Sequence, residues 1–170
     1  MKLLIHEIST PWGEIASVVD VTKEPVVIGA GFKPLTKLMK QLDEKSKDFE
    51  IKKDPKLAGV TNVVKNWIDG DLDAFDDLKV LQPGGDFRQS CWQAMRKIKA
   101  GKVLTYADLA HRAGNKKAAR AAGSACAKNL IAPFVPCHRV IKTGGAIGNY
   151  GFGISLKQAI LAHEGIHNLH

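Results

Sequence analysis

Five consecutive residues, Pro-Cys-His-Arg-Val at positions 136–140, place a thiol beside an imidazole and a guanidinium within an apolar run. A free cysteine is mostly protonated at neutral pH and becomes nucleophilic only near a base or a positive charge. His138 and Arg139 supply both, so Cys137 is the candidate nucleophile. A buried structural cysteine is an equally common reading of a thiol in an apolar segment.

A second group of residues can support that thiol. Adjacent side chains diverge on a strand and lie about 100° apart on a helix, so we expect His138 to reach Cys137 through a bridging water. Glu164, in the segment His-Glu-Gly-Ile, is the only glutamate after Glu50. A carboxylate in that role orients the imidazole, as the third member of a triad does.

The first part of the chain predicts a small α/β domain over residues 1–82. Short β-branched runs at 2–8, 15–20 and 26–32 predict a small antiparallel sheet. Apolar residues at helical spacing over 35–42 and 57–67 predict two amphipathic packing helices. We find no cluster of titratable residues in this domain and expect it to act as a scaffold.

A boundary is expected at Gln82-Pro-Gly-Gly85, where proline and two glycines meet a change in charge balance. The second domain, residues 86–170, is predicted to be mostly helical, with a first helix over 87–99. Thr105 then caps a short helix with Asp108 in a capping-box variant, and Gly114 ends it. Asn115 is expected to cap the next helix, which gives a helix-turn-helix unit over 106–128.

Positive charge is concentrated in the second domain. Residues 1–85 contain 12 Lys and Arg against 14 Asp and Glu, whereas residues 86–170 contain 13 against 3. The net charge is therefore −2 before the boundary and +10 after it. Such an excess attracts polyanions, of which nucleic acid is the commonest, although it can also serve solubility alone.

Composition places the chain among globular proteins, with 45% hydrophobic residues in 170. Three cysteines without paired spacing argue against a disulfide framework and for a reducing compartment, which predicts the cytoplasm. The N-terminus lacks a signal-peptide core and no long apolar run predicts a membrane span.

The second helix of the helix-turn-helix unit carries one long side chain, Arg120, through a run of small residues from 118 to 127. Small residues permit close approach to another surface. One face, with Lys116, Arg120 and Gly123, can meet DNA, while Ala119 and Cys126 lie on another face that can meet the core. A tightly packed core helix is the alternative, because alanine is the best helix former.

Read together, these motifs resemble the O6-alkylguanine-DNA alkyltransferases. The resemblance covers about residues 86–166 and is highly specific there, whereas the first 85 residues match only in length and in the opening Ser-Thr-Pro-Trp-Gly pattern. It is carried by Tyr106, Lys-Ala-Ala-Arg-Ala-Ala-Gly at 117–123, Asn129, Pro-Cys-His-Arg-Val, Gly-Asn-Tyr at 148–150 and Leu-Ala-His-Glu-Gly at 161–165.

The resemblance implies irreversible, single-turnover transfer of an alkyl group from O6 of guanine, and also from O4 of thymine, to Cys137 after nucleotide flipping. His138 is implied as the base through a water, with Glu164 as its orienter. Tyr106 assists the leaving guanine, and Asn129 is the hinge before the active-site segment. The pocket is implied to be lined by Tyr150, Gly151, Val140 and Pro136.

The implied partner is double-stranded DNA containing O6-alkylguanine, bound by a monomer through the minor groove. Arg120 is the implied intercalating finger. The other implied DNA-binding residues are Ala119, Ala121, Gly123, Lys116, Lys117 and Thr105. The resemblance implies a ribonuclease H-like α/β domain followed by a winged-helix or helix-turn-helix domain. We expect no cofactor, and the lack of a long apolar run predicts no membrane association.

Three departures from the family pattern matter. Members often have proline after the hinge asparagine, whereas Leu130 follows Asn129 here. Phe152 stands where many members carry glycine, so we expect its ring to narrow the pocket and disfavour bulky O6 groups. Some members bind a structural zinc through N-terminal cysteines and histidines, but His6 is the only such residue in the first 90, which predicts no metal.

Two other functions are compatible with parts of this sequence. A cysteine hydrolase would also use Cys, His and an acid, but it would turn over and would need neither the Arg120 helix nor the basic half. A non-catalytic alkyltransferase-like protein that senses damage would bind DNA in the same way. Such proteins replace the nucleophile, so the presence of Cys137 distinguishes this chain from them.

Overall fold

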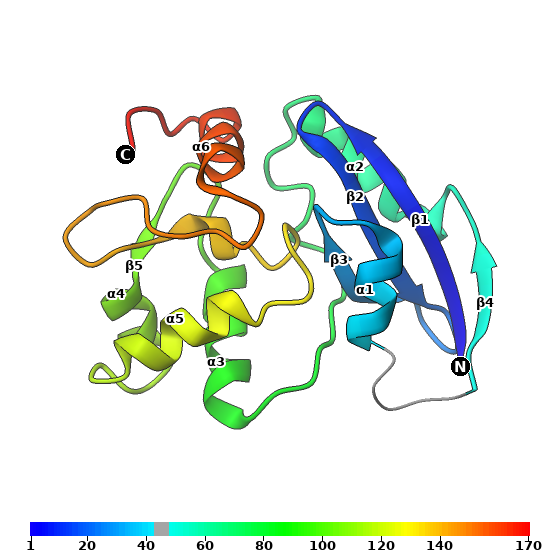
Figure 1. Ribbon diagram of the computed structural model, residues 1–170, viewed down its shortest axis with the longest axis horizontal. Helices are drawn as coiled ribbons and strands as arrows, with labels where there is room; N and C mark the ends of the chain where they lie inside the picture. The colour runs from blue at the N-terminus through cyan, green and yellow to red at the C-terminus, as the bar shows by residue number, and fades with distance from the viewer. Residues whose placement is uncertain (43–47) are drawn as a thin grey trace. The chain divides into compact units, whose positions relative to one another are not determined.

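The structure is a computed structural model that describes residues 1–42 and 48–170 as two compact units (Figure 1). The first unit comprises residues 1–82 together with residues 130–134, and the second comprises residues 83–129 and 135–170. The chain therefore passes between the units three times, after residues 82, 129 and 134. Nothing in the sequence indicated that five residues of the C-terminal half belong with the first unit.

A four-stranded sheet with strand order β3-β2-β1-β4 forms the centre of the first unit. Strands β1 (Lys2–Thr10), β2 (Gly13–Asp20) and β3 (Val26–Gly31) pair antiparallel, as predicted. Strand β4 (Glu50–Lys53), which was not predicted, pairs parallel with β1, so the complete sheet is mixed. All four residues of β4 are exposed, and a short exposed strand has no alternation of buried positions to reveal it.

Both packing helices predicted for the first unit are present. Helix α1 (Leu35–Leu42) places Leu38 in a buried cluster with Leu3 and Val18 of the sheet. The second begins as a 3-10 turn, η2 (Leu57–Gly59), and continues as α2 (Val60–Ile68). Burying each such aliphatic side chain contributes about 1.5–3 kcal/mol to stability. A helix is favoured in these segments because it places their apolar residues on one face that can be buried, and this is why the apolar spacing predicted it.

Residues 130–134 are packed as part of the first unit. The Ala30 amide donates to the Leu130 carbonyl at 2.8 Å, and Ile131 forms a parallel bridge with Ala30 of β3. The ring of Phe134 meets Phe75 edge-on, with centroids 4.9 Å apart. The segment that directly precedes Pro136 and Cys137 in the chain is therefore held by backbone pairing and aromatic packing.

The second unit is mostly helical. Strands β5 (Leu104–Thr105) and β6 (Val140–Ile141) pair in parallel, with Leu104 opposite Val140. This pairing brings the start of α4 (Tyr106–Arg112) beside the chain that leaves the Cys137 turn. Its elements are α3 (Asp86–Arg96), β5 (Leu104–Thr105), α4 (Tyr106–Arg112), α5 (Ala119–Ala127), η3 (Cys137–Arg139), β6 (Val140–Ile141) and α6 (Ile154–His163).

The predicted capping box at the start of α4 is confirmed. The Thr105 hydroxyl accepts from the Asp108 amide at 3.1 Å, and the Asp108 carboxylate accepts from the Thr105 amide at 3.3 Å. The prediction that Asn115 caps the next helix was wrong, because α5 begins at Ala119. Asn115 accepts instead from the Lys117 amide two residues on, a local turn that competes with helix.

The mixed α/β class is confirmed, whereas the ribonuclease H-like and winged-helix assignments stay predictions. No helix in the described part of the chain is long and apolar enough to cross a membrane.

Candidate active site

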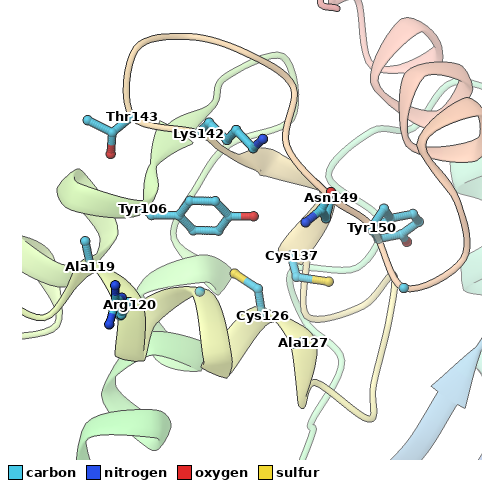
Figure 2. A pocket seen from close by; sticks show the side chains of 12 residues that line it. Tyr106, Ala119, Arg120, Cys126, Ala127, Cys137, Lys142, Thr143, Asn149 and Tyr150 are labelled. Atoms are coloured by element: carbon cyan, nitrogen blue, oxygen red, sulfur yellow. The ribbon is translucent and has the colours of Figure 1, made fainter.

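A cavity of about 650 Å³ lies in the second unit, between α5 and the loop that follows β6 (Figure 2). Small-molecule sites in proteins typically have volumes of roughly 300–1,000 Å³. Cys137, Cys126 and Tyr106 all line this cavity, and Figure 2 shows their side chains. A candidate nucleophile and a candidate proton donor therefore border the same space.

Predicted site residues from separate parts of the chain meet at this cavity. Arg120, exposed on α5, and Lys142, exposed on the opposite loop, give it a positively charged rim. The predicted residues that line it are Cys137, Tyr106, Arg120, Ala119, Gly123, Tyr150 and Gly151.

Other predicted residues lie outside the cavity lining. Val140 is fully buried in β6, and Pro136 is buried next to Cys137 in the chain. We predicted that both residues line the pocket, but neither is part of its lining. Lys116 and Lys117 lie in the turn before α5 and not on the helix. The remaining predicted residues away from the lining are Thr105, Ala121, Asn129, His138 and Glu164.

Cys137 begins the 3-10 turn η3 and is 8% exposed. Burial raises the pKa of its thiol, because the charged thiolate loses hydration. A hydrogen bond from the Asn129 side chain and the positive charge of Lys157 act in the opposite direction and lower that pKa. Asn129 also donates from Nδ2 to the Val135 carbonyl at 2.8 Å, which holds the backbone two residues before the thiol.

His138 and Glu164 are paired as predicted. His138 Nε2 lies 2.8 Å from Glu164 Oε1, and both side chains are fully buried. Burial lowers the pKa of His138, opposed by the Glu164 carboxylate, so the imidazole is neutral at pH 7 and able to take a proton. Its other nitrogen, Nδ1, is buried without a hydrogen-bond partner among the described residues.

Arg139 does not supply the positive charge that we expected it to give to Cys137. Its Nε and Nη2 donate to the two oxygens of Glu164, at 3.0 and 2.5 Å, and Nη1 donates to the Ile98 carbonyl at 2.6 Å. Burial alone would raise the pKa of Glu164, but the charges and hydrogen bonds of His138 and Arg139 lower it to about 2. The guanidinium charge is thus neutralised by Glu164.

Lys157 is a functional candidate that sequence reasoning missed. Its side chain is fully buried, and Nζ donates to the carbonyls of Val140, at 2.7 Å, and Asn149, at 3.1 Å. Burial lowers the pKa of Lys157, while Cys137 and Cys126 oppose that shift. The available signal was the position of Lys157 on α6, three and four residues before two buried apolar residues, which puts it on the buried face of the helix. Lysine is rarely buried unless it is paired, so a lysine on that face is a functional candidate.

Tyr106 crosses the cavity between two glycines. A Cβ on Gly123 would lie 3.9 Å from its ring, and one on Gly148 would lie 3.3 Å from its hydroxyl. Gly148 also has a φ of +78°, so both its backbone conformation and its space favour glycine. Burial raises the pKa of Tyr106, which keeps the phenol protonated as a donor.

Phe152 is next to the cavity wall, where it contacts Tyr150. Its ring does not line the cavity but packs edge-on against Tyr150, with centroids 5.2 Å apart. Tyr150 in turn stands edge-on to His138, with centroids 6.5 Å apart. The predicted direct narrowing by Phe152 was therefore wrong, and what Phe152 can do is fix the wall that Tyr150 provides.

Cys126 is a second thiol of the cavity that we had expected to face the core. Burial raises the pKa of this thiol, and the neighbouring Cys137 raises it further, so Cys126 is protonated at neutral pH.

Over the described residues, no three His, Cys, Asp or Glu side chains are grouped to hold a metal ion. The chemistry that the site can do is nucleophilic attack by Cys137 with Tyr106 as proton donor.

The chain is similar to known proteins of one family. Residues 86–166 match the family model of the 6-O-methylguanine DNA methyltransferase DNA-binding domain. A methylated-DNA–protein-cysteine methyltransferase of Salmonella typhimurium is 30% identical over 166 residues, 97% of each chain. The human protein of that name is 45% identical over 86 residues, 51% of this chain and 42% of the human protein.

Solved structures agree with the sequence matches. The crystal structure of Mycobacterium tuberculosis O6-methylguanine methyltransferase has a TM-score of 0.73 and 27% identity, over 95% of this chain and 92% of that chain. The Mycobacterium tuberculosis OGT crystallised in complex with DNA has a TM-score of 0.70 and 27% identity, over 96% and 92%. The fold and site thus define a DNA-repair methyltransferase with a DNA-binding domain. The chain belongs to the methylated-DNA–protein-cysteine methyltransferase family.

The low pKa of Glu164 predicts a stability effect in acid. Because its folded-state pKa of about 2 lies below the ordinary 4.5, the unfolded chain binds more protons between these values. The stabilisation from Glu164 is complete above pH 4.5 and is lost as pH falls toward 2. Between pH 5 and 3, the free energy of unfolding in urea should fall by roughly 1–2 kcal/mol more in the wild type than in Glu164→Gln. Glu50→Gln, on the exposed β4, should follow the wild type; equal falls in all three proteins would contradict the assignment.

The charge of Lys157 predicts a shift in the reactivity of Cys137. Lys157→Met removes the cation that lowers the Cys137 pKa, so less thiolate forms at neutral pH. Labelling of Cys137 by iodoacetamide at pH 7.5, followed on its peptide by mass spectrometry, should slow about tenfold, with the pH profile displaced to higher pH. Lys102→Met, an exposed control, should leave both unchanged. An undisplaced profile in Lys157→Met would rule out this role.

Proposed function

We propose that this protein repairs alkylated DNA by irreversible transfer of the alkyl group on O6 of guanine to Cys137. The observation that carries the proposal is that Cys137 and Tyr106 line one cavity. The positive charge of Lys157 lowers the pKa of the Cys137 thiol, and His138, the next residue in the chain, is paired with Glu164. A nucleophile and a proton donor that line one cavity large enough for a nucleobase suit displacement of a purine.

Access to O6 requires that the guanine leave the stack, because a nucleophile buried in a protein cannot reach a base inside a duplex. Helix α5 is suited to the minor groove because small side chains surround one exposed arginine, Arg120, at the cavity rim. We propose that Arg120 fills the space left by the flipped nucleotide. Ala119, Ala121, Gly123 and Thr105 approach the DNA, and Lys116 and Lys117 in the preceding turn pair with phosphates.

The first chemical step is formation of the Cys137 thiolate. His138 takes the thiol proton through one intervening water, and the resulting imidazolium is stabilised by Glu164 at 2.8 Å. Lys157 supplies the positive charge that favours the thiolate, and Asn129 donates a hydrogen bond to the sulfur. Arg139 keeps Glu164 ionised and oriented during this transfer.

The second step is displacement. The Sγ atom of Cys137 forms a bond to the alkyl carbon as the bond from that carbon to O6 breaks, and the electron pair passes into the guanine ring. Tyr106 donates its proton to the ring and is later restored by the proton that His138 removed from Cys137. The net result is one alkylated cysteine and one guanine.

The product explains why the protein acts once. A thioether has no carbonyl that water can attack, and neither His138 nor Glu164 can break its C–S bond. The same geometry serves O4 of thymine, whose alkyl group is displaced in the same way. Tyr150, Gly151 and the Phe152 ring behind Tyr150 set the range of alkyl groups that fit.

The remaining assignments follow from this function. We propose that residues 1–82, joined by residues 130–134, form a ribonuclease H-like scaffold domain. The rest of residues 86–170 form a winged-helix domain that binds DNA and accepts the alkyl group. The protein acts as a monomer without cofactor in the cytoplasm, where its three free cysteines stay reduced.

The proposal is tested on the DNA. Duplex containing one O6-methylguanine is added in excess, and the modified base that remains is quantified after digestion. Loss should reach a plateau at one base per protein molecule. Cys137→Ser should remove none, whereas Cys126→Ser, which changes the other thiol of the cavity, should reach the same plateau.

Each other outcome contradicts the proposal in a distinct way. Loss that continues past one base per protein would indicate turnover, as expected of a hydrolase. Binding of the duplex without any loss would indicate a damage-sensing protein. Activity in Cys137→Ser but not in Cys126→Ser would show that Cys126, and not Cys137, accepts the alkyl group.

A further inference from the structure

Two buried side-chain amides connect the three places where the chain passes between its two units. Gln82, the last residue before the first passage, accepts through Oε1 from the Leu130 amide at 2.8 Å. Asn129, the last residue before the second passage, donates through Nδ2 to the Val135 carbonyl, just after the third, at 2.8 Å. Gln82 is 4% exposed and Asn129 is 8% exposed, so both hydrogen bonds are largely protected from water.

The bond to Gln82 is possible because residue 130 is leucine. A proline at this position would have no N–H to donate and would fix its own φ near −65°. Leucine leaves φ free and adds a half-buried N–H group that needs an acceptor. The carbonyl of Leu130 is also occupied, because it accepts from the Ala30 amide at 2.8 Å.

We propose that Gln82 is a positioning residue for alkyl transfer, whose hydrogen bond to Leu130 fixes the backbone after Asn129. The inference rests on the proposed function of Cys137. Asn129 is the residue through which Gln82 acts, because Asn129 is peptide-bonded to Leu130 and its amide reaches both the Val135 carbonyl and the Cys137 sulfur. Gln82 touches neither the substrate nor the reacting atoms.

A double-mutant cycle tests this role. The variants are Gln82→Leu, which removes the acceptor at similar volume, Leu130→Pro, which removes the donor and fixes φ, and their combination. Gln93→Leu, at an exposed glutamine of α3, is the matched control. Single-turnover transfer from duplex containing O6-methylguanine gives the maximal rate and the half-saturating DNA concentration for each variant.

Gln82→Leu should lower the maximal rate about tenfold, because an unsatisfied amide disturbs the segment before Cys137, and should leave the half-saturating DNA concentration unchanged. In the Leu130→Pro background the same change should cost less than about twofold, because the N–H that Gln82 serves is gone. Gln93→Leu should match the wild type. A wild-type rate in Gln82→Leu, or an equal loss in both backgrounds, would overturn the proposal.

Amide exchange in the wild type covers the case in which a variant fails to fold. The Leu130 amide should exchange at least about 100-fold more slowly than an unprotected amide, and free exchange would overturn the proposal. If the wild type transfers no alkyl group, the proposed function fails on its own. The same variants are then compared by the rate at which iodoacetamide labels Cys137, a measurement that needs no DNA. Gln82→Leu should change this rate in the wild-type background and change it less in the Leu130→Pro background.

Discussion

The buried carboxylate of Glu164 is the interaction on which the active site depends. One of its oxygens accepts from both His138 and Arg139, and the other accepts a second bond from Arg139. Arg139 continues to the Ile98 carbonyl, so this carboxylate joins the end of α6, the Cys137 turn and the end of α3. Removing one partner of such a group leaves an uncompensated buried charge, which typically costs about 3–5 kcal/mol.

This network determines which cation remains for the thiol. Arg139 follows His138 in the chain and looked like the natural partner of Cys137, but its charge is neutralised by Glu164. Lys157, from the opposite end of α6, lowers the Cys137 pKa instead and binds two carbonyls around the site. The two ends of one helix therefore hold the groups that we propose for thiolate support and for imidazole orientation.

Sequence reasoning succeeded where the signal was local. The capping box at Thr105 and the helical spacing around Leu38 depend on neighbours within one or two turns, and both were predicted. The pairing of His138 with Glu164 was predicted because so few carboxylates occur in the second half. The roles predicted for Tyr106 and Arg120 came from the family resemblance, because a single phenol or guanidinium in a sequence does not indicate its own role.

Features that depend on distant contacts were not predictable in the same way. Strand β4 has a single apolar residue, Ile51, and exists because the edge of β1 offers it a partner. Cys126 was assigned to the core because helical spacing alone does not say which face of α5 borders a cavity. Val140 lies next to the motif in sequence but is turned into the β5–β6 pair, where its side chain is fully buried.

The central claim is that the alkyl group ends on Cys137. The most direct measurement is peptide mapping by mass spectrometry of the protein after reaction with duplex DNA containing O6-methylguanine. The account predicts one methyl group per protein, located on the peptide that contains Cys137, with Cys126 unmodified. A methyl group on Cys126 or elsewhere, or an unmodified protein after the DNA has been repaired, would contradict it.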